Sequence, residues 1–78
     1  MPRLRFRLKE VLTEEGLIPH NLEKVLGDKV GRATVYRLAR REPSRVDLDT
    51  LAWVIWGLRK LTGKPYGVQD LLEYQEEP

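Results

Sequence analysis

The stretch "PHNLEKVLGDKVGRATVYRLARR", residues 19–41, decides the fold. Three apolar residues of its first half share one side of a helix: Leu22, Val25 and Leu26. Pro19 suits the first turn of this helix and Gly27 its end. After the short connector "DKVG", a second helix is predicted over residues 32–41. Two helices joined by a glycine and a short connector are the layout of a helix-turn-helix.

The second helix has an apolar side and a basic side. At about 100° per residue, three residues form a stripe that we predict to be buried: Val35, Leu38 and Ala39. The opposite side carries a small residue, arginines and hydroxyl groups, namely Ala33, Arg37 and Arg40 flanked by Thr34, Tyr36 and Arg41. No acidic residue lies between Lys29 and Arg41, although a solvated helix commonly interleaves acids for i,i+4 pairing. This mixture favours the major groove of DNA.

The charges of the chain are unevenly distributed although the net charge is only +2. Residues 29–45 contain six basic residues and the single acid Glu42, whereas residues 10–28 contain five acids and one lysine. The last twelve residues contain four acids and no base. A basic block between acidic neighbours is typical of a phosphate-binding surface. The alternative is an ordinary solvated charged face.

Composition limits the classes of function. A chain of 78 residues predicts a single domain, residues 1–78, and 41% hydrophobic residues predict a globular one. Cysteine is absent and His20 is the sole histidine, so we expect no enzyme, metal site, cofactor or small-molecule substrate. The start lacks the apolar core of a signal peptide, and the apolar run "LAWVIWGL" is too short to span a bilayer. We therefore expect a cytoplasmic protein without a membrane partner.

The rest of the chain is predicted to be mainly helical. Helices are expected over residues 6–16, 49–63 and 68–74, with Asp47 or Asp49 as the N-cap of the long one. Residues 3–6 and 72–75 instead alternate with period two, which indicates short strands. We predict that these strands pair as a two-stranded ribbon that closes the chain ends over the helices.

Five segments together resemble the Cro/C1-type helix-turn-helix family, the Xre-like regulators, in its small stand-alone members. They are "EEGL" (14–17), "NLEKVLG" (21–27), "VGRATVYRLAR" (30–40), "DLDTL" (47–51) and "DLLEY" (70–74). The resemblance covers residues 10–74 and implies an all-α, lambda-repressor-like bundle of five helices. It further implies a helix-turn-helix over about residues 19–41 that binds double-stranded operator DNA, generally as a homodimer. Regulation of transcription, with repression as the expected effect, would be its function.

The resemblance also implies roles for individual residues. Base edges would be contacted by Arg32, Ala33, Tyr36 and Arg37. Phosphates would be contacted by Lys29, Thr34, Arg40, Arg41 and Arg45, with His20 or Asn21 in place of the family's usual glutamine, because Pro19 occupies that position. Glu23 stands where the family prefers alanine, and we expect its carboxylate to pair with Arg37. The connector is about two residues longer than is usual in the family.

Two tryptophans of the long helix suggest a second interface. Trp53 and Trp56 are expected on the side opposite the core stripe of Leu51, Val54, Ile55, Leu58 and Leu61. Their cover could be the terminal ribbon, through Phe6 and Tyr74, or a second subunit for which they would be the anchors of a symmetric dimer. An alternative function follows, in which the chain is a protein-interaction module or an antitoxin-like partner that uses the tryptophan face.

Overall fold

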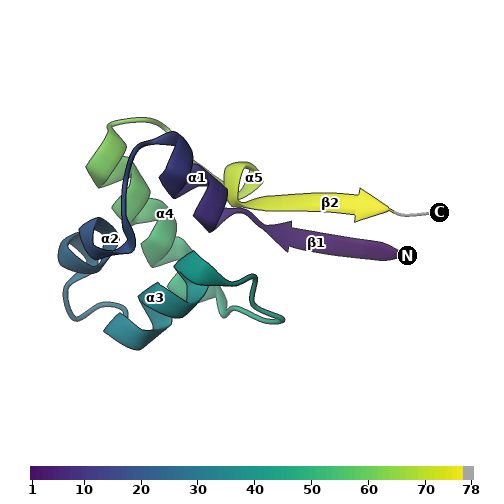
Figure 1. Ribbon diagram of the computed structural model, residues 1–78, viewed down its shortest axis with the longest axis horizontal. Coiled ribbons are helices and arrows are strands. Elements are labelled where there is room, and N and C mark those ends of the chain that lie inside the picture. Colours follow the sequence, from purple (N-terminus) through teal and green to yellow (C-terminus); the bar gives the residue numbers. More distant parts are fainter. Residues whose placement is uncertain (77–78) are drawn as a thin grey trace.

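The computed structural model describes residues 1–76, which form five helices and one two-stranded antiparallel sheet (Figure 1). In chain order the elements are β1 (Pro2–Phe6), α1 (Leu8–Glu14), α2 (Pro19–Leu26), α3 (Arg32–Arg40), α4 (Leu48–Thr62), α5 (Val68–Leu71) and β2 (Leu72–Glu76). The mainly helical class predicted from the sequence is confirmed. The last short helix ends at Leu71 rather than near residue 74, because the chain enters β2 there.

The long helix α4 is delimited by its own sequence. The side chain of Asp47 accepts a hydrogen bond of 2.7 Å from the Thr50 amide, which satisfies one of the free donors of the first turn. Of the two predicted N-cap aspartates, Asp47 is therefore the one used. At the other end Gly63 adopts a left-handed conformation with φ 70°, which glycine accepts without strain.

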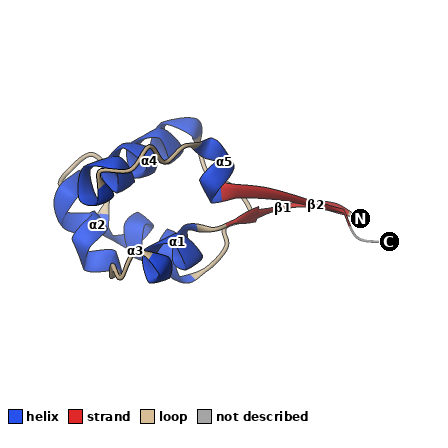
Figure 2. Ribbon diagram, turned by 90° about the horizontal axis from the view of Figure 1, so that it is seen from above, coloured by secondary structure: helices blue, strands red, loops and turns tan. Residues whose placement is uncertain are grey.

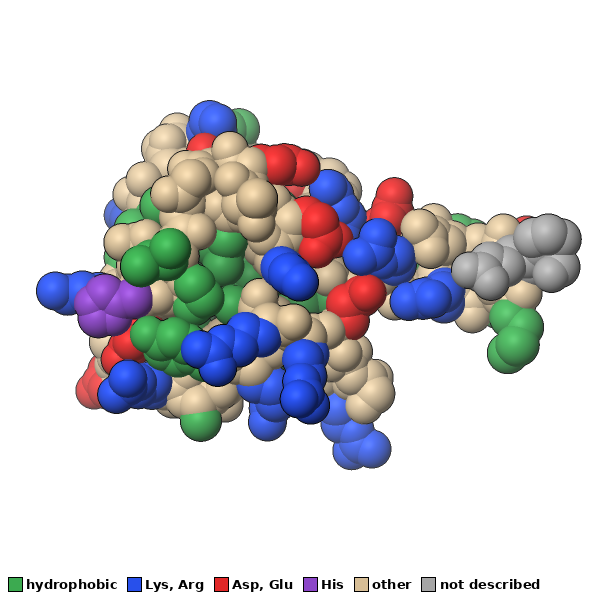
Figure 3. Space-filling model, in the orientation of Figure 1, with side chains coloured by type: hydrophobic (Ala, Val, Ile, Leu, Met, Phe, Trp, Pro, Cys, Tyr) green, Lys and Arg blue, Asp and Glu red, His purple; other side chains and the backbone are tan. Residues whose placement is uncertain are grey.

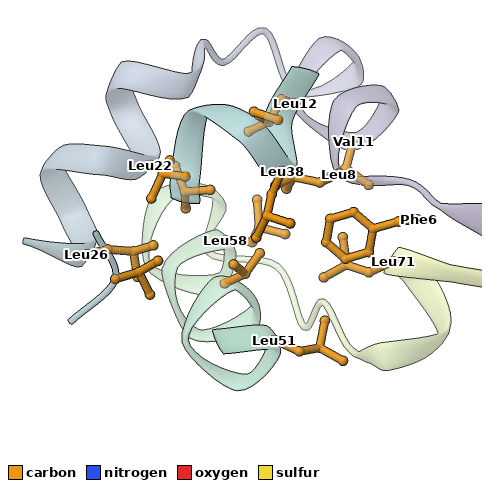
Figure 4. Packing of buried hydrophobic residues seen from close by; sticks show 14 residues of the cluster. Phe6, Leu8, Val11, Leu12, Leu22, Leu26, Leu38, Leu51, Leu58 and Leu71 are labelled. Carbon is orange, nitrogen blue, oxygen red and sulfur yellow. The ribbon is translucent and has the colours of Figure 1, made fainter. Parts of the chain in front are cut away.

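The hydrophobic core lies between the helices. Figure 4 shows Leu38 of α3 beside Leu58 of α4 and Leu8 of α1. Helices α2 and α4 cross closely at Gly57, where a methyl group would lie 2.9 Å from Cδ1 of Leu22. This contact holds α2 against the long helix and so fixes the platform on which α3 rests.

The two chain ends form the predicted ribbon, but its direction differs from the prediction. Strands β1 and β2 pair antiparallel, with Leu4 opposite Tyr74 and Phe6 opposite Leu72. The ribbon does not close over the helices; it projects from one end of the helical body (Figure 1), as the view from above also shows (Figure 2). The reason is that α1 begins and α5 ends at the same end of the bundle, so both strands leave it together.

Candidate nucleic-acid interface

Helix α3 is seated by the apolar stripe that its periodicity predicted. Val35, Leu38 and Ala39 are all buried in the core, which confirms the predicted orientation. The helix ends one residue earlier than expected, at Arg40, because Arg41 has an extended backbone (φ −135°, ψ 150°). The side opposite the stripe is therefore left for solvent or a ligand.

The connector between α2 and α3 contributes to the core. The amide of Lys29 donates to the carbonyl of Leu26 at 3.0 Å, and Val30 is buried. The carbonyl of Gly31 then accepts from the amide of Val35 at 3.0 Å, which starts α3. The long connector is thus used to bury a valine and to set the angle at which α3 begins.

The arginines at the end of α3 differ from those near the ribbon in their charge partners. Within residues 1–76, the guanidinium groups of Arg37, Arg40 and Arg41 form no ion pair, and all three side chains are exposed. In contrast, the three arginines near the ribbon each pair with a glutamate: Arg3, Arg5 and Arg7. Basic side chains gather over α3 and towards the base of the ribbon in Figure 3. An unneutralised positive surface of this kind attracts phosphate groups.

Tyr36 orders two of the arginines of α3. The guanidinium carbons of Arg32 and Arg40, one turn before and one turn after it, lie 5.6 and 5.2 Å from the centre of its ring. Such cation–π contacts restrict the rotamers of both arginines. Together with Ala33 these residues line a shallow hollow of about 330 Å³ on the exposed face of the helix. The small side chain of Ala33 leaves the helix surface open to close approach.

Glu23 pairs with residues other than the expected Arg37. Its carboxylate accepts from the Tyr36 hydroxyl at 3.0 Å, contacts Nδ1 of His20 at 3.3 Å, and lies 3.7 Å from Nε of Arg32. The expectation was wrong because Arg37 lies on the outer face, whereas Tyr36 and Arg32 lean towards α2. Burial opposes ionisation of Glu23, but these hydrogen bonds and the charge of Arg32 outweigh it and lower its pKa.

The remaining predicted phosphate contacts fall in different places. Thr34 is half-buried at the start of α3. The ammonium of Lys29 lies 5.6 Å from the centre of the Trp53 ring. Arg41 borders a hollow of about 190 Å³ that Lys9 and Arg40 also line. Arg45 is set apart, since it lines a groove between the loop before α4 and the ribbon. The structure thus brings most predicted residues to α3 and its two ends.

The tryptophans contact each other and the chain's own lysines. Trp53 and Trp56 form an edge-to-face pair with ring centres 5.4 Å apart, and Lys60 lies 5.6 Å from the Trp56 ring centre. Trp53 packs against the margin of the core rather than opposite it, while Trp56 is 39% exposed. The ribbon does not cover them as one alternative expected, because it points away from the helical body (Figure 1). The second-subunit alternative stays a prediction.

Sequence reasoning gave no role to Glu42, which links α3 to the ribbon. Its carboxylate accepts from the amide of Phe6 at 3.1 Å and from the guanidinium of Arg5 at 3.4 Å. Mainly the Arg5 hydrogen bond, and then that from Phe6, lowers the pKa of Glu42. As the single acid in a basic block, Glu42 was a signal for such an ion pair.

Comparisons with models of protein families, with curated proteins and with solved structures found no match. Across residues 1–76, no three acidic or histidine side chains are grouped so that they could hold a metal ion. None of the helices in this part of the chain has both the length and the apolar character needed to cross a membrane. The chemistry of the α3 surface is therefore the basis for a functional proposal.

Proposed function

We propose that this chain is a sequence-specific, double-stranded DNA-binding transcriptional regulator of the Cro/C1 type that inserts α3 in the major groove. One observation carries the proposal: α3 is fixed to the core by its apolar stripe, and its outer face presents arginines that have no carboxylate partner among residues 1–76. In this proposal the bundle is lambda-repressor-like, with α2 and α3 as its helix-turn-helix, and repression is the expected effect.

The outer face of α3 supplies the base contacts. Arg37 is exposed and forms no ion pair with any residue that the structure describes, so its guanidinium can bind the O6 and N7 atoms of a guanine in bidentate fashion. Ala33 allows the helix to approach the bases and can contact a thymine methyl group. Arg32 and Tyr36 border the same hollow and are already ordered by their stacking contact.

Basic and hydroxyl side chains at the two ends of α3 supply the phosphate contacts. Lys29 and Thr34 lie at its start, and Arg40 and Arg41 lie at its end. Lys9 joins the two arginines around the hollow of about 190 Å³, which Glu10 and Glu42 also line. Such contacts fix the register of a protein on the duplex without reading sequence. They release counterions, so the affinity for DNA should fall steeply as salt rises.

The test begins with selection of a preferred duplex from a random pool at moderate salt. Fluorescence anisotropy then compares this duplex with a scrambled one. Arg37→Ala should lower the preference for the selected duplex by about 1–3 kcal/mol. Arg41→Ala should weaken binding to both duplexes equally and reduce the salt slope by about one.

Lys60→Gln is the matched control, because it removes one positive charge from an exposed position near the end of α4 rather than from α3. It should leave the preference unchanged. The proposal fails if the wild-type chain prefers no sequence, or if Arg37→Ala and wild type bind every duplex alike.

The partly exposed Trp56 supports a second candidate, a module that binds another protein through the tryptophan face. Iodide quenching of tryptophan fluorescence, together with size-exclusion chromatography, distinguishes this candidate from the DNA-binding regulator. A monomer with quenchable tryptophans and no preferred duplex would favour this alternative.

A further inference from the structure

The hollow of about 190 Å³ lies between the end of α3 and the base of the ribbon. Its basic lining residues come from three elements that are distant in the sequence: Arg5 of β1, Lys9 of α1, and Arg40 and Arg41 at the end of α3. Figure 3 shows basic side chains gathered over this part of the surface. A hollow of this size is smaller than the pockets that hold drug-sized ligands. It suits a small ion or the end group of a larger molecule.

The four cations of the hollow differ in their charge partners. Arg5 is shared between two carboxylates of the hollow, because its Nη2 lies 3.0 Å from Glu10 and 3.4 Å from Glu42. Among residues 1–76 no ion pair is formed by the other three, which are Lys9, Arg40 and Arg41. With four basic and two acidic lining residues, the hollow keeps a net charge of +2.

The carboxylate of Glu42 is already bound at one side of the hollow as an anion. It accepts hydrogen bonds from the Phe6 amide at 3.1 Å and from Nε and Nη2 of Arg5 at 3.4 Å, and it lies 4.0 Å from Arg3. Guanidinium groups and backbone amides are also the donors that bind phosphate oxygens. The chain's own carboxylate therefore takes donors that an external anion could use.

The other cations of the hollow match a phosphate group. A phosphate monoester has a charge of about −1.5 to −2 at neutral pH and three acceptor oxygens, so several cations can bind it at once. Arg40 and Arg41 can each donate two parallel hydrogen bonds, and Lys9 supplies a point charge. Phe6 and Leu38, which are buried, line the same hollow. Apolar neighbours lower the local dielectric constant and so strengthen the attraction between opposite charges.

We propose that this hollow binds the phosphate group of a free phosphate ester. The ligand is held by Lys9, Arg40 and Arg41. Glu42 competes with the ligand for Arg5, so the carboxylate lowers the affinity of the site. A backbone phosphate of DNA is the other source of the same chemical group. Because three elements surround the hollow, a free ester enters it more easily than a phosphate that is fixed in a duplex.

A bound ester would also regulate DNA binding. Arg40 and Arg41 are phosphate contacts in the proposed function, so the ester would compete with the duplex at that end of α3. This consequence rests on the proposed function, whereas the binding of the ester to the free chain does not.

NMR titration of the full chain without DNA tests the proposal. Inorganic phosphate and phenyl phosphate are the probes, and sodium chloride keeps the ionic strength constant. The amide resonances of residues 5–10 and 38–42 should shift and saturate, while those of residues 59–63 stay in place. Lys9→Gln and Arg41→Gln should each raise the dissociation constant about tenfold, because each removes a charged hydrogen-bond donor. Lys60→Gln is the matched control, since Lys60 is exposed on α4 and does not line the hollow. It should leave the dissociation constant unchanged.

The competition by Glu42 gives a second readout. Glu42→Gln should lower the dissociation constant for phosphate by about fivefold or more, because Arg5 becomes a further donor to the ligand. Asp49→Asn is the matched control, because it removes one negative charge in the first turn of α4, outside the hollow. It should leave the constant nearly unchanged. Circular dichroism confirms that each variant keeps its helices.

The outcomes separate the free ester from the DNA backbone. The proposal is overturned if neither probe causes a saturable shift, or if Lys9→Gln and Lys60→Gln titrate alike. Equal tightening by Asp49→Asn and Glu42→Gln would contradict the competition. If the free chain binds neither probe but Lys9→Gln reduces the salt slope of duplex binding by about one, the site belongs to the DNA backbone and the free ester is excluded. A chain that binds phosphate at the hollow and prefers no duplex would support this site and contradict only the proposed function.

Discussion

The hydroxyl of Tyr36 on α3 donates a hydrogen bond of 3.0 Å to the carboxylate of Glu23 on α2. The guanidinium groups of Arg32 and Arg40 both lie over the ring of the same tyrosine. One side chain therefore ties the two helices together and orders two arginines before any ligand arrives. Such preorganisation lowers the entropic cost of binding.

We expect Tyr36→Phe to lower the free energy of unfolding near neutral pH, because it removes the hydrogen bond and keeps the ring. Glu23 has a lowered pKa in the folded chain despite its burial. Folding therefore favours the ionised carboxylate, and this contribution is full above the unfolded carboxyl pKa of about 4.3. This stabilisation is lost as the pH falls through the lowered pKa of Glu23 in the folded chain.

Urea unfolding measures the free energies of unfolding of wild type and Tyr36→Phe. Tryptophan fluorescence follows the transition at pH 7 and at steps through the acid range. The difference between the two free energies should shrink as the pH falls. A difference that stays constant in acid would contradict the assigned link to Glu23.

The sequence predicted those features that depend on local periodicity. The spacing of Val35, Leu38 and Ala39 was sufficient to predict the buried side of α3, and the period-two alternation of the chain ends was sufficient to predict the two strands. In both cases neighbouring residues alone determine which side of a helix or strand is apolar. The i,i+4 spacing of Arg32, Tyr36 and Arg40 also places the two arginines within reach of the tyrosine ring on one side of the helix. The direction of the ribbon was mispredicted, since it depends on where α1 begins relative to the end of α5.

The sequence pattern does not predict contacts between residues that are distant in the chain. Glu42 meets Phe6 and Arg5 across more than thirty residues of sequence. Gly57 looks like an ordinary residue of a helical pattern, and only the fold shows α2 crossing α4 there. Such features depend on how elements meet in space, which periodicity does not specify.

Gly57→Val should reduce the free energy of unfolding by about 1–3 kcal/mol, which is typical of overpacking in a core. The reason is that the added side chain would collide with Leu22, Leu26 and Val25, whose nearest atoms lie 2.9–3.3 Å from a Cβ at this position. Ala52→Val is the matched control, since Ala52 is exposed on the same helix. Thermal unfolding of both variants measures the effect, and equal stabilities would show that α2 and α4 are not held by this contact.

Glu42→Gln should loosen the ribbon at its base. The variant loses the ion pair with Arg5 and weakens the hydrogen bond from the Phe6 amide, so hydrogen exchange should quicken in β1 and leave the core of α4 unaffected. The lowered pKa of Glu42 means that the wild-type link is present above the usual carboxyl pKa and is lost in acid. At low pH, wild type and variant should therefore have the same protection factors in β1. Equal protection of β1 in both proteins at neutral pH would disprove the link.

Tyr66→Phe should destabilise the junction between α1 and the turn after α4. Glu15 accepts hydrogen bonds from the Tyr66 hydroxyl and from Lys64, the latter at 2.8 Å. The hydrogen bond to Glu15, aided by burial, raises the pKa of Tyr66 to about 12. We expect a loss of about 1 kcal/mol in the free energy of unfolding at neutral pH. Lys64→Gln should weaken the same junction while leaving the tyrosine hydroxyl in place.

The pH dependence distinguishes this hydrogen bond from simple packing. Because the folded pKa of Tyr66 lies above the unfolded value of about 10, its stabilisation is complete below pH 10 and disappears as the pH rises through about 12. Urea unfolding of wild type and Tyr66→Phe across the alkaline range should show the two stabilities converging. Ultraviolet titration of the phenolate should show the highest-pH tyrosine step in the wild type and its absence in Tyr66→Phe. A wild type in which every tyrosine ionises near pH 10 would contradict the Tyr66–Glu15 hydrogen bond.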